Sequence, residues 1–219
     1  RVAGLRALVR TGNATLSEDG RNPSEQLALI HDDARKLMRM QQIVYKKLIK
    51  EMEAQGIILC TRSKLTGRDL KFLEDHFLNK VFPVLSPLAI DPAHPFPYIS
   101  GLSLNLAIRV RNAKTGTEEF ARLKVPQMLP RFVRVDSREG VSSVRYIALE
   151  DLIANQLQDL FPGMEILEHH TFRVTRNEDV QIDEDETEDL IQVLEKGLLK
   201  RRFGPPIRLE VGEKMDPTT

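Results

Sequence analysis

The sequence contains few of the residues that build disulfide, zinc or base-stacking sites. Of its 219 residues only Cys60 is a cysteine, none is tryptophan, and aromatic residues make up 5%. A single cysteine excludes an internal disulfide, which is typical of proteins in a reducing cytoplasm. It also leaves no set of ligands with tetrahedral zinc spacing. Lys plus Arg equals Asp plus Glu at 32 each. The overall charge therefore gives no argument for binding to nucleic acid or to an anionic membrane, and any polyanion site has to be a local patch.

Several motifs that identify enzymes are also absent. There is no G-x-x-x-x-G-K-[ST] phosphate loop, no G-x-G-x-x-G turn and no G-x-S-x-G elbow. No stretch has the pattern of a signal peptide, and no apolar run approaches the roughly 20 residues of a membrane span. The acidic run at 183–189 lacks the glycine of a calcium loop, so we interpret it as the solvated start of a helix. Hydrophobic residues still make up 41%, which predicts a chain that folds.

The first part of the chain is predicted to be helical. Residues 1–10 have the pattern of the last turns of a helix, and 11–21 form a polar loop. Asn22 and Glu25 then form a capping-box pattern, Pro23 suits the first helical position, and apolar residues recur at helical spacing to Gln55. A helix of that length, about 50 Å, cannot bury its apolar stripe alone. We therefore predict that residues 1–56 are the end of a truncated antiparallel helical bundle, and that the chain is a piece of a longer protein.

The second part, residues 57–212, is predicted to be an α+β domain with a mainly antiparallel or mixed sheet. Two-residue alternation is clearest from Leu102 to Val110, and a turn at 112–117 predicts an antiparallel return over 120–125. Further strands are expected at 57–60, 132–135, 144–147, 165–175 and 207–211. Helices are expected from a cap at Thr66 to near Phe82, over 150–161, and after the acidic run. Residues 213–219 are interpreted as a tail or the start of a linker.

Two groups of side chains are candidates for chemistry. His169 and His170 are adjacent in a predicted strand, so their side chains point to opposite faces and cannot share one task. No carboxylate is clearly placed to orient either ring, and we interpret both as structural or surface residues, like His94. A basic patch is the stronger candidate. Because arginine matches phosphate oxygens well, we predict polyanion contacts by six residues: Arg109, Arg111, Arg122, Lys124, Arg201 and Arg202. The alternatives are a solubilising outer face for the first four and a charged helix end for the last two.

The most distinctive stretch is 83–97, PVLSPLAIDPAHPFP, which holds five of the twelve prolines and is too apolar for a solvated linker. Together with other stretches it resembles the bacterial polyphosphate kinases of the long, histidine-phosphorylating type. The stretches that carry the resemblance keep the family's order along the chain: RVAGL (1–5), VFPVLSPLAIDPAHPFP (81–97), SGLSLNL (100–106), LFPGMEI (160–166), EHHTFRVTRN (168–177) and RRFG (201–204).

The resemblance implies an enzyme of four parts that reversibly moves the terminal phosphate of ATP onto polyphosphate, with Mg²⁺ and a phosphohistidine. It implies that this chain covers the end of the N-terminal helical domain and the middle, or head, domain. The family's catalytic, metal-binding and ATP-binding residues fall outside the chain, so none is assigned here. The implied partners are polyphosphate, ATP and other copies in a homo-oligomer, without nucleic acid. The implied location is cytoplasmic, with association with the inner face of the membrane left open.

On this reading the chain is a non-catalytic portion that serves subunit contacts and shapes the approach to the active site. The alternative is a stand-alone polyanion-binding or protein-interaction module without kinase activity. The two differ in whether the chain needs further domains to function.

Overall fold

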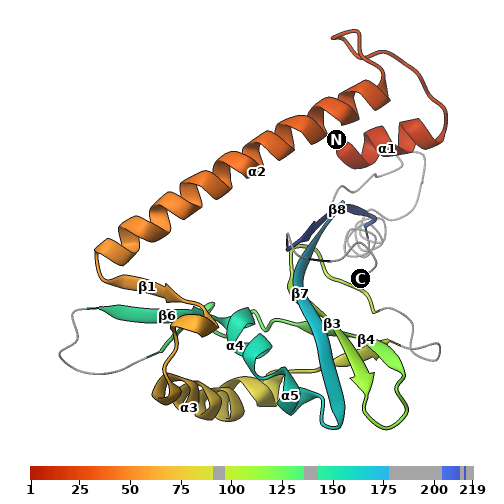
Figure 1. Ribbon diagram of the computed structural model, residues 1–219. Helices are drawn as coiled ribbons and strands as arrows, with labels where there is room; N and C mark the ends of the chain where they lie inside the picture. The colour runs from red at the N-terminus through yellow and green to blue at the C-terminus, as the bar shows by residue number, and fades with distance from the viewer. Residues whose placement is uncertain (91–96, 136–142, 178–203, 213–214, 216–219) are drawn as a thin grey trace, which may run out of the picture. The chain divides into compact units, whose positions relative to one another are not determined.

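The structure is a computed structural model that describes residues 1–90, 97–135, 143–177, 204–212 and 215 (Figure 1). The chain divides into two compact units, residues 1–51 with 176–207 and residues 52–175 with 208–219. The described residues contain helices and two sheets, which confirms the α+β class.

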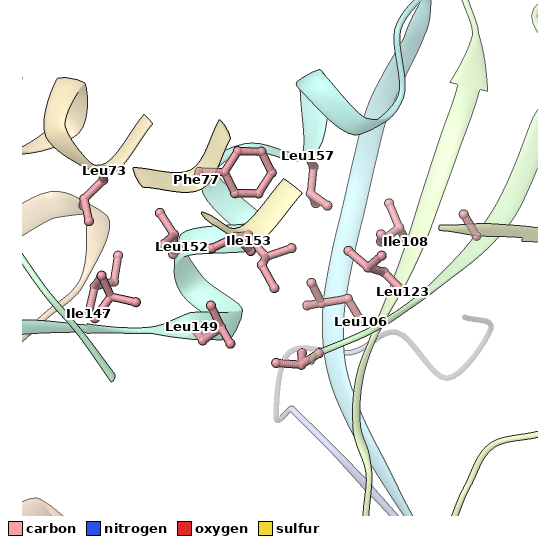
Figure 2. Packing of buried hydrophobic residues seen from close by; sticks show 14 of the residues in the cluster. Leu73, Phe77, Leu106, Ile108, Leu123, Ile147, Leu149, Leu152, Ile153 and Leu157 are labelled. Atoms are coloured by element: carbon pink, nitrogen blue, oxygen red, sulfur yellow. The ribbon is translucent and has the colours of Figure 1, made fainter. Parts of the chain in front are cut away.

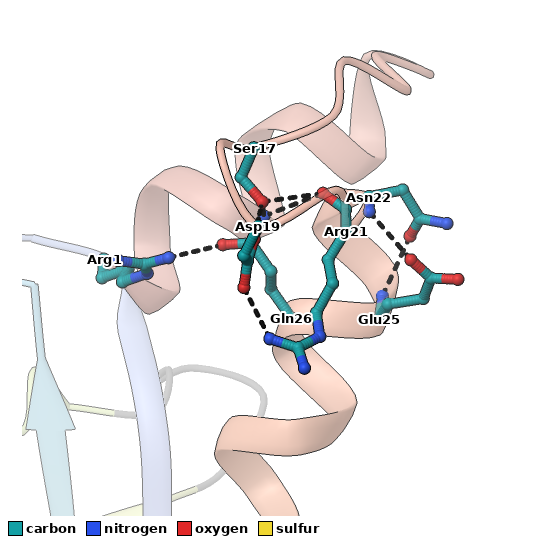
Figure 3. Close-up of polar contacts among 7 residues, drawn as sticks. All are labelled: Arg1, Ser17, Asp19, Arg21, Asn22, Glu25 and Gln26. Carbon is teal, nitrogen blue, oxygen red and sulfur yellow. Dashed lines mark hydrogen bonds and ion pairs between the residues drawn. The ribbon is translucent and has the colours of Figure 1, made fainter.

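The first unit contains α1 (Val2–Arg10) and most of α2 (Pro23–Ala54), as the apolar spacing predicted. The capping box at the start of α2 is confirmed, because Asn22 N–H donates to Glu25 Oε2 and Glu25 N–H donates to Asn22 Oδ1, both at 2.9 Å (Figure 3). Arg1 donates to Oε1 of the buried Gln26 at 2.7 Å, which ties the start of α1 to the first turn of α2.

Along α2 many apolar side chains are exposed in the described structure, including Leu37 and Ile43, which are 68% and 69% exposed. Burial of one apolar stripe normally provides most of a helix's stability. The need for partner helices, expected from the sequence, stays a prediction.

The second unit contains two sheets. The smaller has the strand order β1-β6-β5, with β1 (Ile57–Cys60) parallel to β6 (Val144–Ala148) and β5 (Phe132–Arg134) antiparallel to β6. The larger has the order β2-β4-β3-β7-β8. Its strands are β2 (Leu88–Ile90), β4 (Glu118–Lys124), β3 (Leu104–Asn112), β7 (Met164–Arg176) and β8 (Pro206–Val211). The pairs β2–β4, β3–β4 and β3–β7 are antiparallel. All strands predicted from the sequence are present, but 132–134 and 144–148 belong to a separate sheet with β1.

The helix predicted from Thr66 to near Phe82 begins as expected, and its hydrogen-bond pattern changes after His76. Thr66 caps α3 (Gly67–His76) in a capping box with Asp69. A π-helical turn then covers Phe77–Val81, and a 3₁₀ turn covers Phe82–Val84. Pro83 has no N–H and its ring crowds the carbonyl four residues back, so the regular α-helical ladder cannot continue through it. The predicted helical stretch is therefore present to Phe82, with turns that are π-helical and 3₁₀ rather than α-helical after His76.

The helix predicted over 150–161 is divided in two. α4 (Leu149–Asn155) and α5 (Leu157–Leu160) are separated by Gln156, whose backbone is non-helical at φ −118° and ψ 21°. The helix expected after the acidic run, and Arg201 and Arg202 at its end, lie outside the described residues.

The main core of this unit lies between one face of the larger sheet and helices α3, α4 and α5 (Figure 2). Leu106, Ile108 and Val110 of β3 pack there, as their alternation predicted, together with Phe77, Leu152 and Ile153. A smaller cluster on the opposite face of the sheet contains Ile99, Ala107, Phe172 and Val174. Both faces of β3 are therefore partly covered, and the second face carries the candidate site.

Candidate polyanion-binding face

The four hairpin cations lie on one face of the larger sheet. In the β3–β4 register Arg109 faces Phe120, Arg111 faces Glu118, Arg122 faces Ala107 and Lys124 faces Asn105. Directly opposed residues share a face, and so do residues two apart along a strand. The register therefore places all four cations on one face, as expected: Arg109, Arg111, Arg122 and Lys124. Contact with a polyanion stays a prediction.

Carboxylates neutralise one end of this face. Arg111 Nη2 lies 2.7 Å from Glu118 Oε1, and Arg111 Nη1 lies 3.3 Å from Glu165 Oε2. Arg109 Nε lies 3.0 Å from Glu168 Oε1. Glu118 precedes the returning strand that we read from the sequence, and Glu165 and Glu168 come from β7, a strand whose pairing with β3 the sequence did not reveal. Arg109 and Arg111 are therefore ion-paired in this structure.

A β-bulge places both β7 carboxylates on the same face. Arg109 faces Glu168, the register shifts, and Arg111 faces Glu165. Residues three apart on a regular strand point to opposite faces, and the extra residue in the bulge reverses that. Sequence alternation alone would have assigned Glu165 and Glu168 to different faces.

Arg122 is different, because its side chain is buried. The residue is 7% exposed, and its Nε donates at 2.8 Å to Oδ1 of Asn105, which is 0% exposed. The Asn105 amide in turn donates to the carbonyl and hydroxyl oxygens of Ser103 at 2.8 and 3.1 Å. Burial lowers the pKa of the Arg122 guanidinium from its ordinary value. Nothing in the sequence marked Asn105 and Ser103 as its partners.

Lys124 lies at the same end of the face as Arg122. It is exposed, lies two residues beyond Arg122 and faces Asn105 across the hairpin. In the part of the chain that the structure describes, no ion pair joins Arg122 or Lys124 to a carboxylate. The predicted patch thus separates into a neutralised end, Arg109 and Arg111, and a cationic end, Arg122 and Lys124.

The two adjacent histidines differ in their surroundings. His170 Nε2 lies 3.2 Å from Glu168 Oε2, so the expectation that no carboxylate is placed near either ring was wrong for His170. The same-face position of residues two apart on β7 explains this contact.

His169 lines a cavity of about 300 Å³ on the α4 side of the sheet, with Glu150, Asp151 and Thr171. Burial lowers the pKa of His169, and it raises the pKa of Glu150 and Asp151 despite the opposing effect of Arg131. The cavity thus combines two carboxyl groups whose pKa is raised by burial with an imidazole whose pKa is lowered by burial.

A second concavity, the α3–β5 groove, has a volume of about 430 Å³. Its lining is mainly apolar, with basic groups among them: Phe72, His76, Lys80, Val81, Leu129, Pro130, Phe132, Val133, Arg134 and Leu149. Phe72 and Phe132 are 41% and 49% exposed, so the groove presents aromatic surface to solvent.

Among the described residues, no group of three or more His, Cys, Asp or Glu side chains could hold a metal ion. Within the same residues, no helix combines the length and the apolar character needed to cross a membrane.

Comparison with known proteins identifies the class of protein. A family model described as the polyphosphate kinase middle domain matches residues 68–219, and one described as the polyphosphate kinase N-terminal domain matches residues 1–60. The chain therefore belongs to the polyphosphate kinase family and corresponds to its N-terminal and middle-domain region.

Individual relatives agree. A polyphosphate kinase of Streptomyces coelicolor is 51% identical over 217 residues, covering 99% of this chain and 28% of the relative. One of Mycobacterium tuberculosis is 45% identical over 225 residues, covering 98% and 30%. The crystal structure of polyphosphate kinase from Porphyromonas gingivalis matches with a TM-score of 0.72 at 24% identity, covering all of this chain and 29% of that one, which supports the fold. The chain thus spans less than a third of the length of these relatives, and a stand-alone module is not favoured.

Proposed function

We propose that the whole protein reversibly transfers the terminal phosphate of ATP to polyphosphate through a phosphohistidine. The observation that carries this proposal is that both family models match in the family's order, over nearly the entire chain. Such a transfer needs a positioned nucleophile, cations on the transferring oxygens and a metal. We propose that Mg²⁺ and ATP bind mainly outside this chain, which acts as a non-catalytic portion.

The test is a polyphosphate-synthesis assay with the 219-residue chain, ATP and Mg²⁺, run beside the full-length Streptomyces coelicolor relative. We expect polyphosphate from the full-length relative and none above background from the chain alone. Synthesis by the chain alone would show that the non-catalytic role is wrong. Absence of synthesis by the full-length relative would remove the basis for the proposed reaction.

A second candidate role for this portion is subunit contact in a homo-oligomer. The α3–β5 groove supports it, since exposed aromatic side chains in an apolar concavity are typical of interaction surfaces. Sedimentation of the chain should show a dimer that Phe132→Asp dissociates. The control is Met128→Asp, because Met128 is 81% exposed and does not line the groove. A strictly monomeric chain at high concentration contradicts this role.

The location and domain boundaries expected from the sequence are also proposals. The cytoplasmic location is supported by Cys60, which is a free, buried thiol. The boundaries at 1–56, 57–212 and 213–219 are testable by limited proteolysis, because cleavage falls preferentially between compact units. Predominant cleavage inside the 57–135 stretch would contradict them.

A further inference from the structure

We infer that Arg122 and Lys124, oriented by Asn105, form a binding subsite for the phosphoryl oxyanions of a chain of phosphates. The inference rests on the proposed function only in its choice of a phosphate polymer as the natural ligand. It narrows the four hairpin cations predicted from the sequence to two, and it follows from the burial and pairing of their side chains.

The charge of Arg122 is buried without the compensation that buried charges usually have. Its described partner is the neutral amide of Asn105, reached through Nε at 2.8 Å. Taking a guanidinium out of water costs free energy that a neutral acceptor offsets only in part. Arg122 keeps 7% of its surface exposed, which leaves limited access for a ligand. An oxyanion is the class of ligand that supplies the missing negative charge.

The site is also preorganised. Asn105 is 0% exposed, and its Nδ2 donates to both the carbonyl and the hydroxyl oxygen of Ser103, while its Oδ1 accepts from Arg122. Ser103 Oγ donates onward to the carbonyl of Ser100 at 2.8 Å. A guanidinium held through Nε presents its Nη edge in one orientation, so less side-chain entropy is lost when a ligand binds.

Lys124 extends the subsite along the strand. Residues two apart on a strand are separated by roughly 7 Å, a spacing that lets two cations contact different phosphates of one polymer. The carboxylates of the face pair with Arg109 and Arg111 at the other end. Repulsion of an anion is therefore weakest at Arg122 and Lys124.

The experiment is calorimetric titration of the 219-residue chain with tripolyphosphate at constant ionic strength. We expect binding by the original chain and at least about tenfold weaker binding by Arg122→Met, because this variant loses charge-assisted hydrogen bonds to the phosphoryl oxygens. Lys124→Met should weaken binding by a smaller factor. The matched control is Arg111→Met, which removes a cation of the same face that is already ion-paired, and it should change affinity less than about twofold.

Circular dichroism of each variant separates binding from folding. Arg122→Met leaves the buried Oδ1 of Asn105 without its donor, so the fold of this variant has to be verified. If it does not fold, Lys124→Met and Arg122→Lys decide, since Arg122→Lys keeps the charge but loses the planar fork. ATP and long-chain polyphosphate are the other two ligands to titrate. Tighter binding of the longer chains assigns the subsite to the polymer, and equal affinity for ATP assigns it to triphosphates in general.

The inference is overturned if the original chain does not bind tripolyphosphate, or if Arg111→Met lowers affinity as much as Arg122→Met. The titration measures binding without turnover, so its outcome is independent of the synthesis assay. If the chain does not bind tripolyphosphate but the full-length relative makes polyphosphate, the subsite is wrong and the proposed reaction still holds.

Discussion

Replacement of Asp69 by alanine should destabilise the second unit more than any other single change at the start of α3. Asp69 is 2% exposed, and its Oδ2 accepts three hydrogen bonds, from the Thr66 N–H and hydroxyl at 2.8 Å and from Arg145 Nη1 at 2.9 Å. Arg145 also donates to the carbonyl of Lys64 at 2.7 Å. One carboxylate thus joins a helix cap to a strand of the smaller sheet.

The magnitude follows from the lost contacts. The charge-assisted bond to Arg145 contributes about 1.5–3 kcal/mol, and the capping interaction contributes about 1 kcal/mol. Asp69→Ala should therefore lower the free energy of unfolding by roughly 3 kcal/mol, and Tm by roughly 6–12 °C for a chain of this size. Glu74→Ala, an exposed position on the same helix, is the matched control and should change stability by less than about 0.5 kcal/mol.

The assay is urea unfolding followed by circular dichroism, in a double-mutant cycle with Arg145→Met. A coupling energy of about 1–3 kcal/mol is expected, and one below about 0.5 kcal/mol would refute the reasoning. Burial raises the pKa of Asp69, but the hydrogen bonds from Thr66 and Arg145 outweigh it, so the pKa lies below 3.8. The stability that Asp69 contributes is therefore present above pH 3.8 and is lost as pH falls through the lowered pKa.

Three further predictions use the same unfolding measurement. Leu102 is 57% exposed and has φ 58°, so Leu102→Gly should stabilise the chain by about 1 kcal/mol; a lower urea midpoint than that of Leu102→Ala would contradict this. A Cβ at Gly204 would lie 1.8 Å from the Asn177 carbonyl oxygen, so Gly204→Ala should cost about 1–3 kcal/mol, whereas Gly67→Ala, with no atom within 4 Å, should not. Burial, aided by His170, lowers the pKa of His169 below 6.5, so its contribution to stability is lost as pH falls from 6.5 through that pKa; His169→Gln should flatten the decline, and an unchanged slope would count against it.

Features that depend on neighbours in the chain were predictable. The caps at Asn22 and Thr66 involve residues three positions apart, and each is present. The alternation of β3 and the turn after it set the hairpin register, which puts Arg109 and Arg122 on one face. In each case the partners are brought together by local backbone geometry, which residue types and spacing report directly.

Features that depend on distant strands were not predictable from the sequence. The sequence by itself determined that cations gather on one face of the hairpin, but only the tertiary structure decided which of them are neutralised. The pairing of β3 with β7, and the bulge that places Glu165 beside Arg111 as well as Glu168 beside Arg109, come from residues more than 50 positions away. The burial of Arg122 likewise depends on packing across the sheet. Charge and alternation describe one strand at a time, whereas the electrostatics of a face are the sum over every strand that forms it.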